Sequence, residues 1–103
     1  MELGDFEAID WDDEDDPDGN LAHCLRHGVD EAVVGQVLAN APVEIKMKLQ
    51  TARFVVVGPD SAGKMWTILF DSSFKRGDWL RPITGWRSEP QEISEWRRAR
   101  GQR

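Results

Sequence analysis

The sequence is poor in cysteine: Cys24 is the only one among its 103 residues. A single cysteine forms no internal disulfide, which excludes a small secreted fold held by disulfides and favours a reducing compartment. Long hydrophobic runs are also lacking, and no positively charged segment followed by an apolar stretch opens the chain. The sequence therefore predicts neither a membrane span nor a signal peptide, and it favours a cytoplasmic protein.

Basic residues are absent from the first 19 positions, which hold ten acidic residues. The remainder carries nine acids and all thirteen lysines and arginines, so its net charge is +4 although the whole chain has a net charge of -6. Overall charge governs solubility, whereas a local basic face decides whether a polyanion binds. RNA is thus not excluded. We expect an acidic leader over residues 1–19 and one folded domain over residues 20–103.

Several motifs that carry chemistry are missing as well. The chain has no phosphate-binding glycine loop, no nucleophile elbow and no paired Cys-x-x-Cys. The acidic stretch 12–19 lacks the ligand spacing of a calcium-binding loop, so a solvated mobile loop is the simpler interpretation. No cofactor is expected.

The hydrophobic pattern predicts a small α+β domain. A weak strand at residues 3–11 is followed by a helix from Asn20 as N-cap to His27, with Leu21 and Leu25 facing inward. Gly28 has the backbone freedom that a helix end needs, and Asp30 is expected to cap a second helix of about ten residues. Strands are then predicted at residues 43–49, 53–58, 65–70 and 79–84, and a last helix begins at Pro90.

These elements predict two N-terminal helices, an antiparallel sheet of about four strands and a C-terminal helix. The N-terminal segment would make a fifth strand if it joins the sheet. Strand 43–49 alternates apolar residues with Glu44, Lys46 and Lys48, which gives it a basic outer face. Pro82 predicts that the last strand lies at an edge or contains a bulge, because proline has no N–H to donate.

His23 and His27 lie one helical turn apart, on nearly the opposite face from the leucines. This is the spacing of two zinc ligands, but no third strong ligand is near. Two interpretations stay open. The histidines exchange protons with a ribose hydroxyl, or His27 caps the carbonyl groups at the helix end. Cys24 is expected to be a small buried residue.

Five cations are scattered through the second half of the chain but can converge when antiparallel strands bring turns together. A cation cluster is what phosphate binding and phosphodiester cleavage require. These cations are Arg53, Lys64, Arg76, Arg81 and Arg87. Among the tryptophans, Trp66 is expected in the core, whereas for Trp86 core packing and stacking on a base are equally compatible with the sequence.

Several short segments, spread in order over most of the chain, together form a recognisable pattern. They are Trp11-Asp12, Asn20-Leu21-Ala22-His23, Arg26-His27-Gly28-Val29, Phe54-Val55-Val56-Val57-Gly58, Gly63 and Arg81-Pro82-Ile83-Thr84-Gly85. With the amphipathic helix after Val29, they resemble the BrnT family of bacterial toxins, which is similar to RelE-like ribonucleases. The resemblance implies a RelE-like α/β fold, metal-independent RNA cleavage and a cognate antitoxin of the ribbon-helix-helix type in a hetero-oligomer. Where the family commonly has alanine and a second arginine, this chain has Gly85 and Trp86.

The resemblance places the family's basic residue before the His-Gly-Val step on Arg26 and its strand arginine on Arg81. The hypothesis is then an endoribonuclease toxin in which the catalytic residues are His23, His27, Arg81 and Arg53. RNA would be bound by Arg26, Lys46, Lys48, Lys64, Arg76, Trp86 and Arg87. The alternatives are a protein-interaction module and an RNA-binding module without catalysis, both on a similar scaffold.

Overall fold

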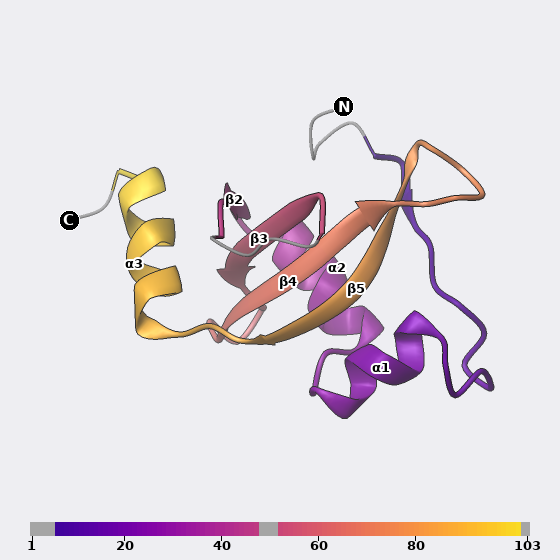
Figure 1. Cartoon of the computed structure of the whole chain (residues 1–103). Helices are drawn as coiled ribbons and strands as arrows, with labels where there is room; N and C mark the ends of the chain where they lie inside the picture. The colour runs from indigo at the N-terminus through magenta and orange to yellow at the C-terminus, as the bar shows by residue number, and fades with distance from the viewer. Residues whose placement is uncertain (1–5, 48–51, 102–103) are drawn as a thin grey trace.

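The computed structural model describes residues 6–47 and 52–101. In chain order, a short strand, two helices, four strands and a final helix form one α+β domain (Figure 1). The elements are β1 (Ala8–Ile9), α1 (Asn20–Arg26), α2 (Glu31–Ala39), β2 (Val43–Ile45), β3 (Phe54–Pro59), β4 (Met65–Ser72), β5 (Trp79–Arg87) and α3 (Pro90–Ala99). The predicted α+β class is confirmed. Residues 3–5, Lys48 and Leu49, to which the sequence assigned strand positions, lie outside the described residues.

The five strands form a single sheet in the order β1-β5-β4-β3-β2. Strands β2 to β5 are antiparallel, as predicted, while β1 pairs in parallel with β5 through Ala8 and Trp79 and through Ile9 and Leu80. The sheet is therefore mixed. The fifth strand shows that the N-terminal segment is part of the domain from at least Ala8 onward.

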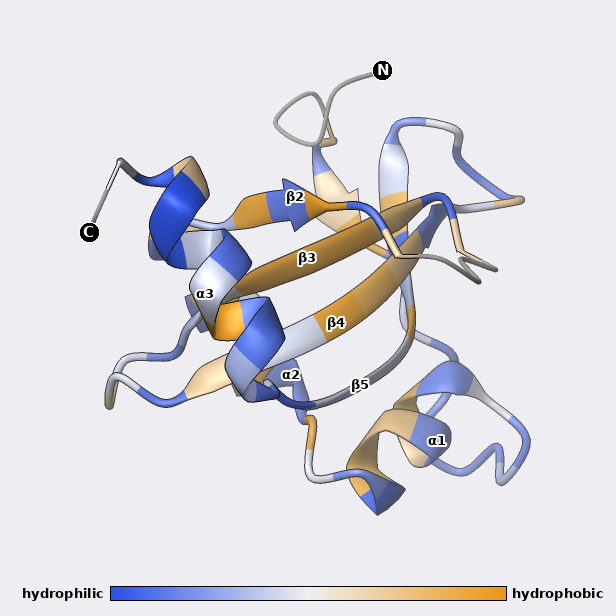
Figure 2. Ribbon diagram, turned by 60° about the vertical axis from the view of Figure 1, so that its left-hand side comes forward, coloured by the Kyte–Doolittle hydropathy of each residue, from blue (hydrophilic) through white to orange (hydrophobic). Residues whose placement is uncertain are grey.

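Helices cover both faces of the sheet. Helices α1 and α2 lie on one side and α3 on the other (Figures 1 and 2). Strand β3 shows why this is required, because Phe54 and Val56 join the core under α1 and α2 whereas Val55 and Val57 join the core under α3. A nearly continuous apolar strand needs cover on both faces.

The N-terminal segment also contributes to the core. Phe6, Ile9 and Trp11 pack against the cluster that contains Cys24 and Val29, and the ring of Phe6 meets that of Phe54 edge to face with centroids 5.5 Å apart. Burial of such rings is worth about 2 kcal/mol each. The acidic N-terminal segment therefore also contains three apolar side chains, Phe6, Ile9 and Trp11, that attach it to the core.

Two details of α1 differ from expectation. Leu25, which was expected to face inward, is 52% exposed, whereas its neighbour Cys24 is fully buried as predicted. The helix packs against β5, and its buried residues are Asn20, Leu21 and Cys24, so Leu25 lies outside the buried face. The N-cap is Gly19, and Asn20 is the first helical residue. In α2, by contrast, the Asp30 cap is confirmed, since its carboxylate accepts a 2.8 Å hydrogen bond from the N–H of Val33.

Pro82 lies where the sheet is irregular. Leu69 pairs with Thr84 and Phe70 with Pro82, so Ile83 is the extra residue of a bulge. Strand β5 is interior in the strand order, but β1 reaches only Leu80, and the missing N–H of Pro82 costs no hydrogen bond to it. The predicted bulge is confirmed, and its consequence is that β5 changes direction beside the residues that form the site described next.

Candidate functional site

Arg81, on β5, is held by two carboxylates from the segment after β1. Its Nη1 and Nη2 donate to the two oxygens of Asp12 at 2.9 and 2.7 Å, and Nη1 also reaches Asp10 Oδ2 at 3.4 Å. The guanidinium side chain is only 20% exposed. A fork of this kind fixes the plane of the guanidinium. Arg81 is thus a cation whose position is set in advance.

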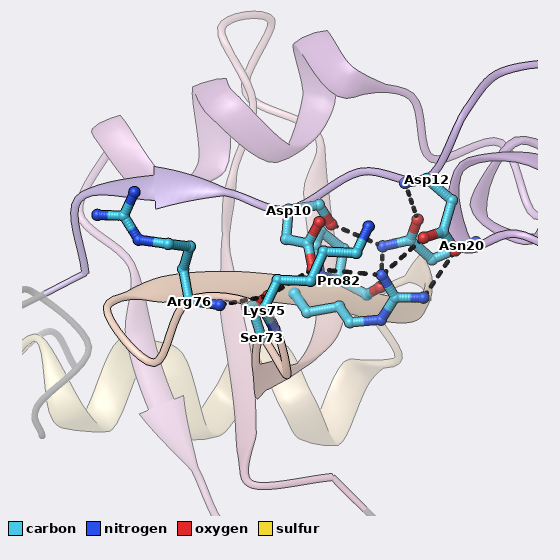
Figure 3. Close-up of polar contacts among 8 residues, drawn as sticks. Asp10, Asp12, Asn20, Ser73, Lys75, Arg76 and Pro82 are labelled. Atoms are coloured by element: carbon cyan, nitrogen blue, oxygen red, sulfur yellow. Dashed lines mark hydrogen bonds and ion pairs between the residues drawn. The ribbon is translucent and has the colours of Figure 1, made fainter.

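Asn20 ties the acidic segment to the sheet. Its backbone N–H donates to Asp12 Oδ2 at 2.9 Å, and its side-chain oxygen accepts from the N–H of Asp12 at 2.8 Å. Its side-chain amide donates to the carbonyls of Asp10 and Pro82 at 2.9 and 2.8 Å. Figure 3 shows Asp10, Asp12, Asn20 and Pro82 in this arrangement. Asn20, which was expected to cap the helix, is therefore a buried residue that joins the start of α1 to the segment of Asp10 and Asp12 and to β5.

His23, on α1, faces the same region. It is exposed, and its Nε2 lies 3.2 Å from Thr84 Oγ1 of β5. An open hollow of about 260 Å³ lies between α1 and β5 and is lined by Asp18, Gly19, Asn20, His23, Arg81 and Ile83. The structure thus brings together two of the four residues that the sequence proposed as catalytic.

His27 and Arg26 lie elsewhere on α1. His27 ends the helix. Its backbone N–H donates to the carbonyl of Cys24, the N–H of Gly28 donates to that of Leu25, and the ring centroid of His27 is 4.9 Å from that of His23. Arg26 donates to the carbonyl of Pro17 in the acidic loop. Neither residue lines the hollow between α1 and β5.

The predicted cations fall into two groups at opposite ends of the sheet. Arg53 donates to Ser72 Oγ at 2.9 Å, next to the pairing of Asp71 with Arg81, and Arg76 follows β4 at the same end. Arg76 itself pairs with Asp78 at 3.2 Å. Lys64 and Arg87 lie at the other end, where Trp66 pairs with Arg87. The five cations do not form one cluster.

The other predicted RNA-binding residues have local partners. Lys46 is exposed and lies 3.7 Å from Glu44, and Arg87 stacks on the ring of Trp66 and donates to the carbonyl of Met65. Lys48 lies outside the described residues. Trp66 is 8% exposed, which confirms its place in the core.

Trp86 is partly buried, packs against the core under α3 and donates its indole N–H to Glu92 at 3.1 Å. Glu92 is 8% exposed and also accepts from Thr67 Oγ1 and from the backbone N–H of Glu89. Of the two interpretations of Trp86, the structure supports core packing. Before it, a Cβ on Gly85 would lie 3.0 Å from the Thr67 carbonyl oxygen and 3.1 Å from Val29 Cγ2, so a larger residue at position 85 would be crowded.

Sequence reasoning missed the carboxylates that hold Arg81, because their acidic surroundings suggested a solvated loop. The spacing of Asp10 and Asp12 contained the signal: residues two apart on an extended segment point to the same side. Thr84 and Ser73 were also missed. Ser73 is buried and donates to Asp10 Oδ2 at 2.6 Å.

Charge pairing shifts two groups of the site. The Arg81 guanidinium, together with the backbone N–H of Asn20, lowers the pKa of Asp12 from its usual 3.8 to about 2, and Asp12 raises the pKa of Arg81. Away from the hollow, burial raises the pKa of the Cys24 thiol to about 11, which makes it a poor nucleophile. Within residues 6–47 and 52–101, no group of three or more metal-ligating side chains is assembled.

The ion pair predicts an acid-sensitive contribution to stability. Because the folded-state pKa of Asp12 is depressed, its contribution is complete above pH 4 and is lost as the pH falls through the range between 3.8 and 2. We expect that loss to be about 2 kcal/mol. Urea unfolding between pH 2 and 5 measures it. Asp12→Asn should remove most of this pH dependence, whereas Asp15→Asn, in the exposed part of the same loop, should keep it. Equal pH dependence in Asp12→Asn and the wild type would contradict the assignment.

Comparison with models of protein families, with curated protein sequences and with solved structures finds no match. In the part of the chain that the structure describes, no helix is long and apolar enough to cross a membrane.

Proposed function

We propose that this chain is a metal-independent endoribonuclease that acts as the toxin of a type II toxin–antitoxin pair. The observation that carries the proposal is that His23 and Arg81, 58 positions apart in sequence, line one hollow. Histidine is the side chain that most often exchanges protons near neutral pH, and a positioned guanidinium stabilises phosphate charge. The sequence resemblance to BrnT toxins supports the same reaction.

In the proposed reaction, His23 removes the proton from a ribose 2'-hydroxyl, whose oxygen attacks the neighbouring phosphorus. The bond from phosphorus to the 5'-oxygen breaks, the leaving oxygen takes up a proton from water, and the proton held by His23 passes to the solvent. The products are a 2',3'-cyclic phosphate and a free 5'-hydroxyl. Arg81 keeps its Nε–H and one Nη2 hydrogen beyond those given to Asp10 and Asp12, so it can stabilise the charge that grows on the phosphoryl oxygens. Arg53, at the same end of the sheet, is the second cation of this proposal.

Induction in a bacterial host tests the proposal. Wild-type chain is expected to arrest growth and cause RNA decay, and His23→Ala is expected to do neither at equal protein levels. His27→Ala, one turn away on the same helix, should remain toxic because His27 does not line the hollow. Normal growth and intact RNA after induction of the wild type would refute the proposal.

The partners proposed with this function are an RNA substrate and a cognate antitoxin of the ribbon-helix-helix type, in a hetero-oligomer. Coexpression with the product of the neighbouring reading frame provides a direct check. Restored growth and a stable complex would support the pairing, whereas a toxin that the neighbouring product neither binds nor neutralises would contradict it.

A second candidate function is a binding module without catalysis. The observation that favours it is the charge balance of the site, where Asp10 and Asp12 outweigh Arg81 and Asp18 adds a further carboxylate to the hollow. Such a site repels RNA more than a bare cation does. A protein partner that the chain binds while it leaves RNA intact would favour this alternative.

A further inference from the structure

Phe74 lies in the loop between β4 and β5 and is 98% exposed, the most exposed large apolar side chain among the described residues. The next two residues are Lys75 and Arg76, both exposed. Burying a phenylalanine side chain stabilises a fold by about 2 kcal/mol, and a fully exposed ring such as that of Phe74 does not contribute this stabilisation. Its position therefore suits a ligand.

The loop that carries Phe74 is ordered by several hydrogen bonds. The N–H of Ser73 donates to the carbonyl of Trp79, and the hydroxyl of Ser73 accepts from the N–H groups of Lys75 and Arg76 at 3.1 and 3.3 Å. The guanidinium of Arg76 also lies over the ring of Trp79, 5.2 Å from its centroid. Phe74 is thus presented by a defined loop, and little conformational freedom would be lost on binding.

The same loop is connected to the candidate site. Ser73, next to Phe74, donates its hydroxyl proton to Asp10, which in turn accepts from Arg81. Lys75 is close enough to Asp12 to lower the pKa of that carboxylate further. Figure 3 shows Lys75 on the side of Asp10 and Asp12, whereas Arg76 extends away from them. The loop that carries Phe74 is therefore tied to the candidate site through the buried pair of Ser73 and Asp10, and Lys75 lies near the Asp12 carboxylate that holds Arg81.

We propose that Phe74 is a base-stacking platform for single-stranded RNA, with Lys75 contacting the adjacent phosphate. The proposal rests on the ribonuclease function proposed above and names its substrate as an unpaired strand. An aromatic face stacks on any unpaired base, and a neighbouring lysine neutralises backbone charge. A protein partner would more often meet an apolar patch of several residues, whereas Phe74 stands between polar and basic neighbours.

Binding to a labelled single-stranded oligoribonucleotide tests this inference. Fluorescence anisotropy is measured in the full-length chain that carries His23→Ala, so that the RNA stays intact. Phe74→Ala is expected to weaken affinity roughly 5- to 150-fold, the effect of losing one stacked base. Phe74→Trp should retain affinity, whereas Phe74→Leu, which is apolar but cannot stack, should lose it. Leu25→Ala, at another exposed apolar side chain, is the matched control and should not change affinity.

Lys75→Ala should weaken RNA binding. It should also reduce the slope of log affinity against log salt concentration by about one, since one phosphate contact is lost. Affinity that Phe74→Ala leaves unchanged would overturn the inference even if the wild type cleaves RNA, and it would leave a protein partner as the ligand of Phe74. The converse result is that the wild type binds RNA in a way that depends on Phe74 and yet never cleaves it. That result would refute the proposed ribonuclease function and support Phe74 as a stacking platform. A His23→Ala chain that binds no single-stranded RNA would overturn the platform outright.

Discussion

His23→Ala is expected to slow RNA cleavage roughly 10²- to 10⁴-fold, the usual contribution of a positioned general base or acid. The free energy of unfolding should change by less than about 0.5 kcal/mol, because His23 is exposed and its ring has one hydroxyl partner in Thr84. Single-turnover cleavage of a defined RNA and urea unfolding measure the two quantities. A large loss of rate without a loss of stability separates chemistry from folding.

Thr84→Val provides a positioning test for the same histidine. It removes the hydroxyl 3.2 Å from Nε2 but keeps the volume of the side chain. If Thr84 orients the imidazole, the pH profile of cleavage should shift while substrate affinity stays the same. An unchanged rate and profile in Thr84→Val would show that the contact is incidental. An unchanged rate in His23→Ala would remove His23 from the reaction.

Arg81→Ala is expected to destabilise the fold by about 3–5 kcal/mol. The substitution leaves the carboxylates of Asp10 and Asp12 without their cation, and the side chain of Asp10 is only 6% exposed. Arg81→Lys keeps the charge but loses the two-pronged contact with Asp12, so a smaller loss of about 1–2 kcal/mol is expected. Urea unfolding at neutral pH measures both variants.

Arg81→Ala combined with Asp12→Ala identifies the source of that loss. The double variant should be more stable than the sum of the single effects predicts, because each residue is costly mainly when its partner is left unpaired. Strict additivity would show that the ion pair does not hold the acidic segment to the sheet. Cleavage by Arg81→Lys, assayed where that variant is folded, then reports the role of the cation in the reaction.

Much of the fold could be predicted because periodicity directly reflects burial. The apolar run of β3, the glycine at the end of α1 and the Asp30 cap each have a local physical cause that the sequence displays. The parallel pairing of β1 could not be predicted in the same way. Its two residues have no periodicity of their own, and their position depends on Phe6 and Trp11 packing on a core formed by residues far along the chain.

The candidate site was predicted only in part, for a similar reason. His23 and Arg81 were proposed from the sequence, and the hollow that they line results from α1 lying against β5. In the sequence, Asp10 and Asp12 resemble the solvated acids that follow them. In the structure, both carboxylates are held by Arg81, which is 71 positions from Asp10. Long-range pairing of charged side chains leaves no periodic pattern in the sequence.

One measurement tests the central claim most directly: incubation of the purified chain with single-stranded RNA in the presence of EDTA, with analysis of the fragment ends. The claim that His23 and Arg81 form a ribonuclease site predicts fragments that carry 2',3'-cyclic phosphates and 5'-hydroxyls, produced by the wild type and not by His23→Ala. RNA that stays intact with an excess of folded wild-type chain, or fragments that His23→Ala produces equally well, would contradict it.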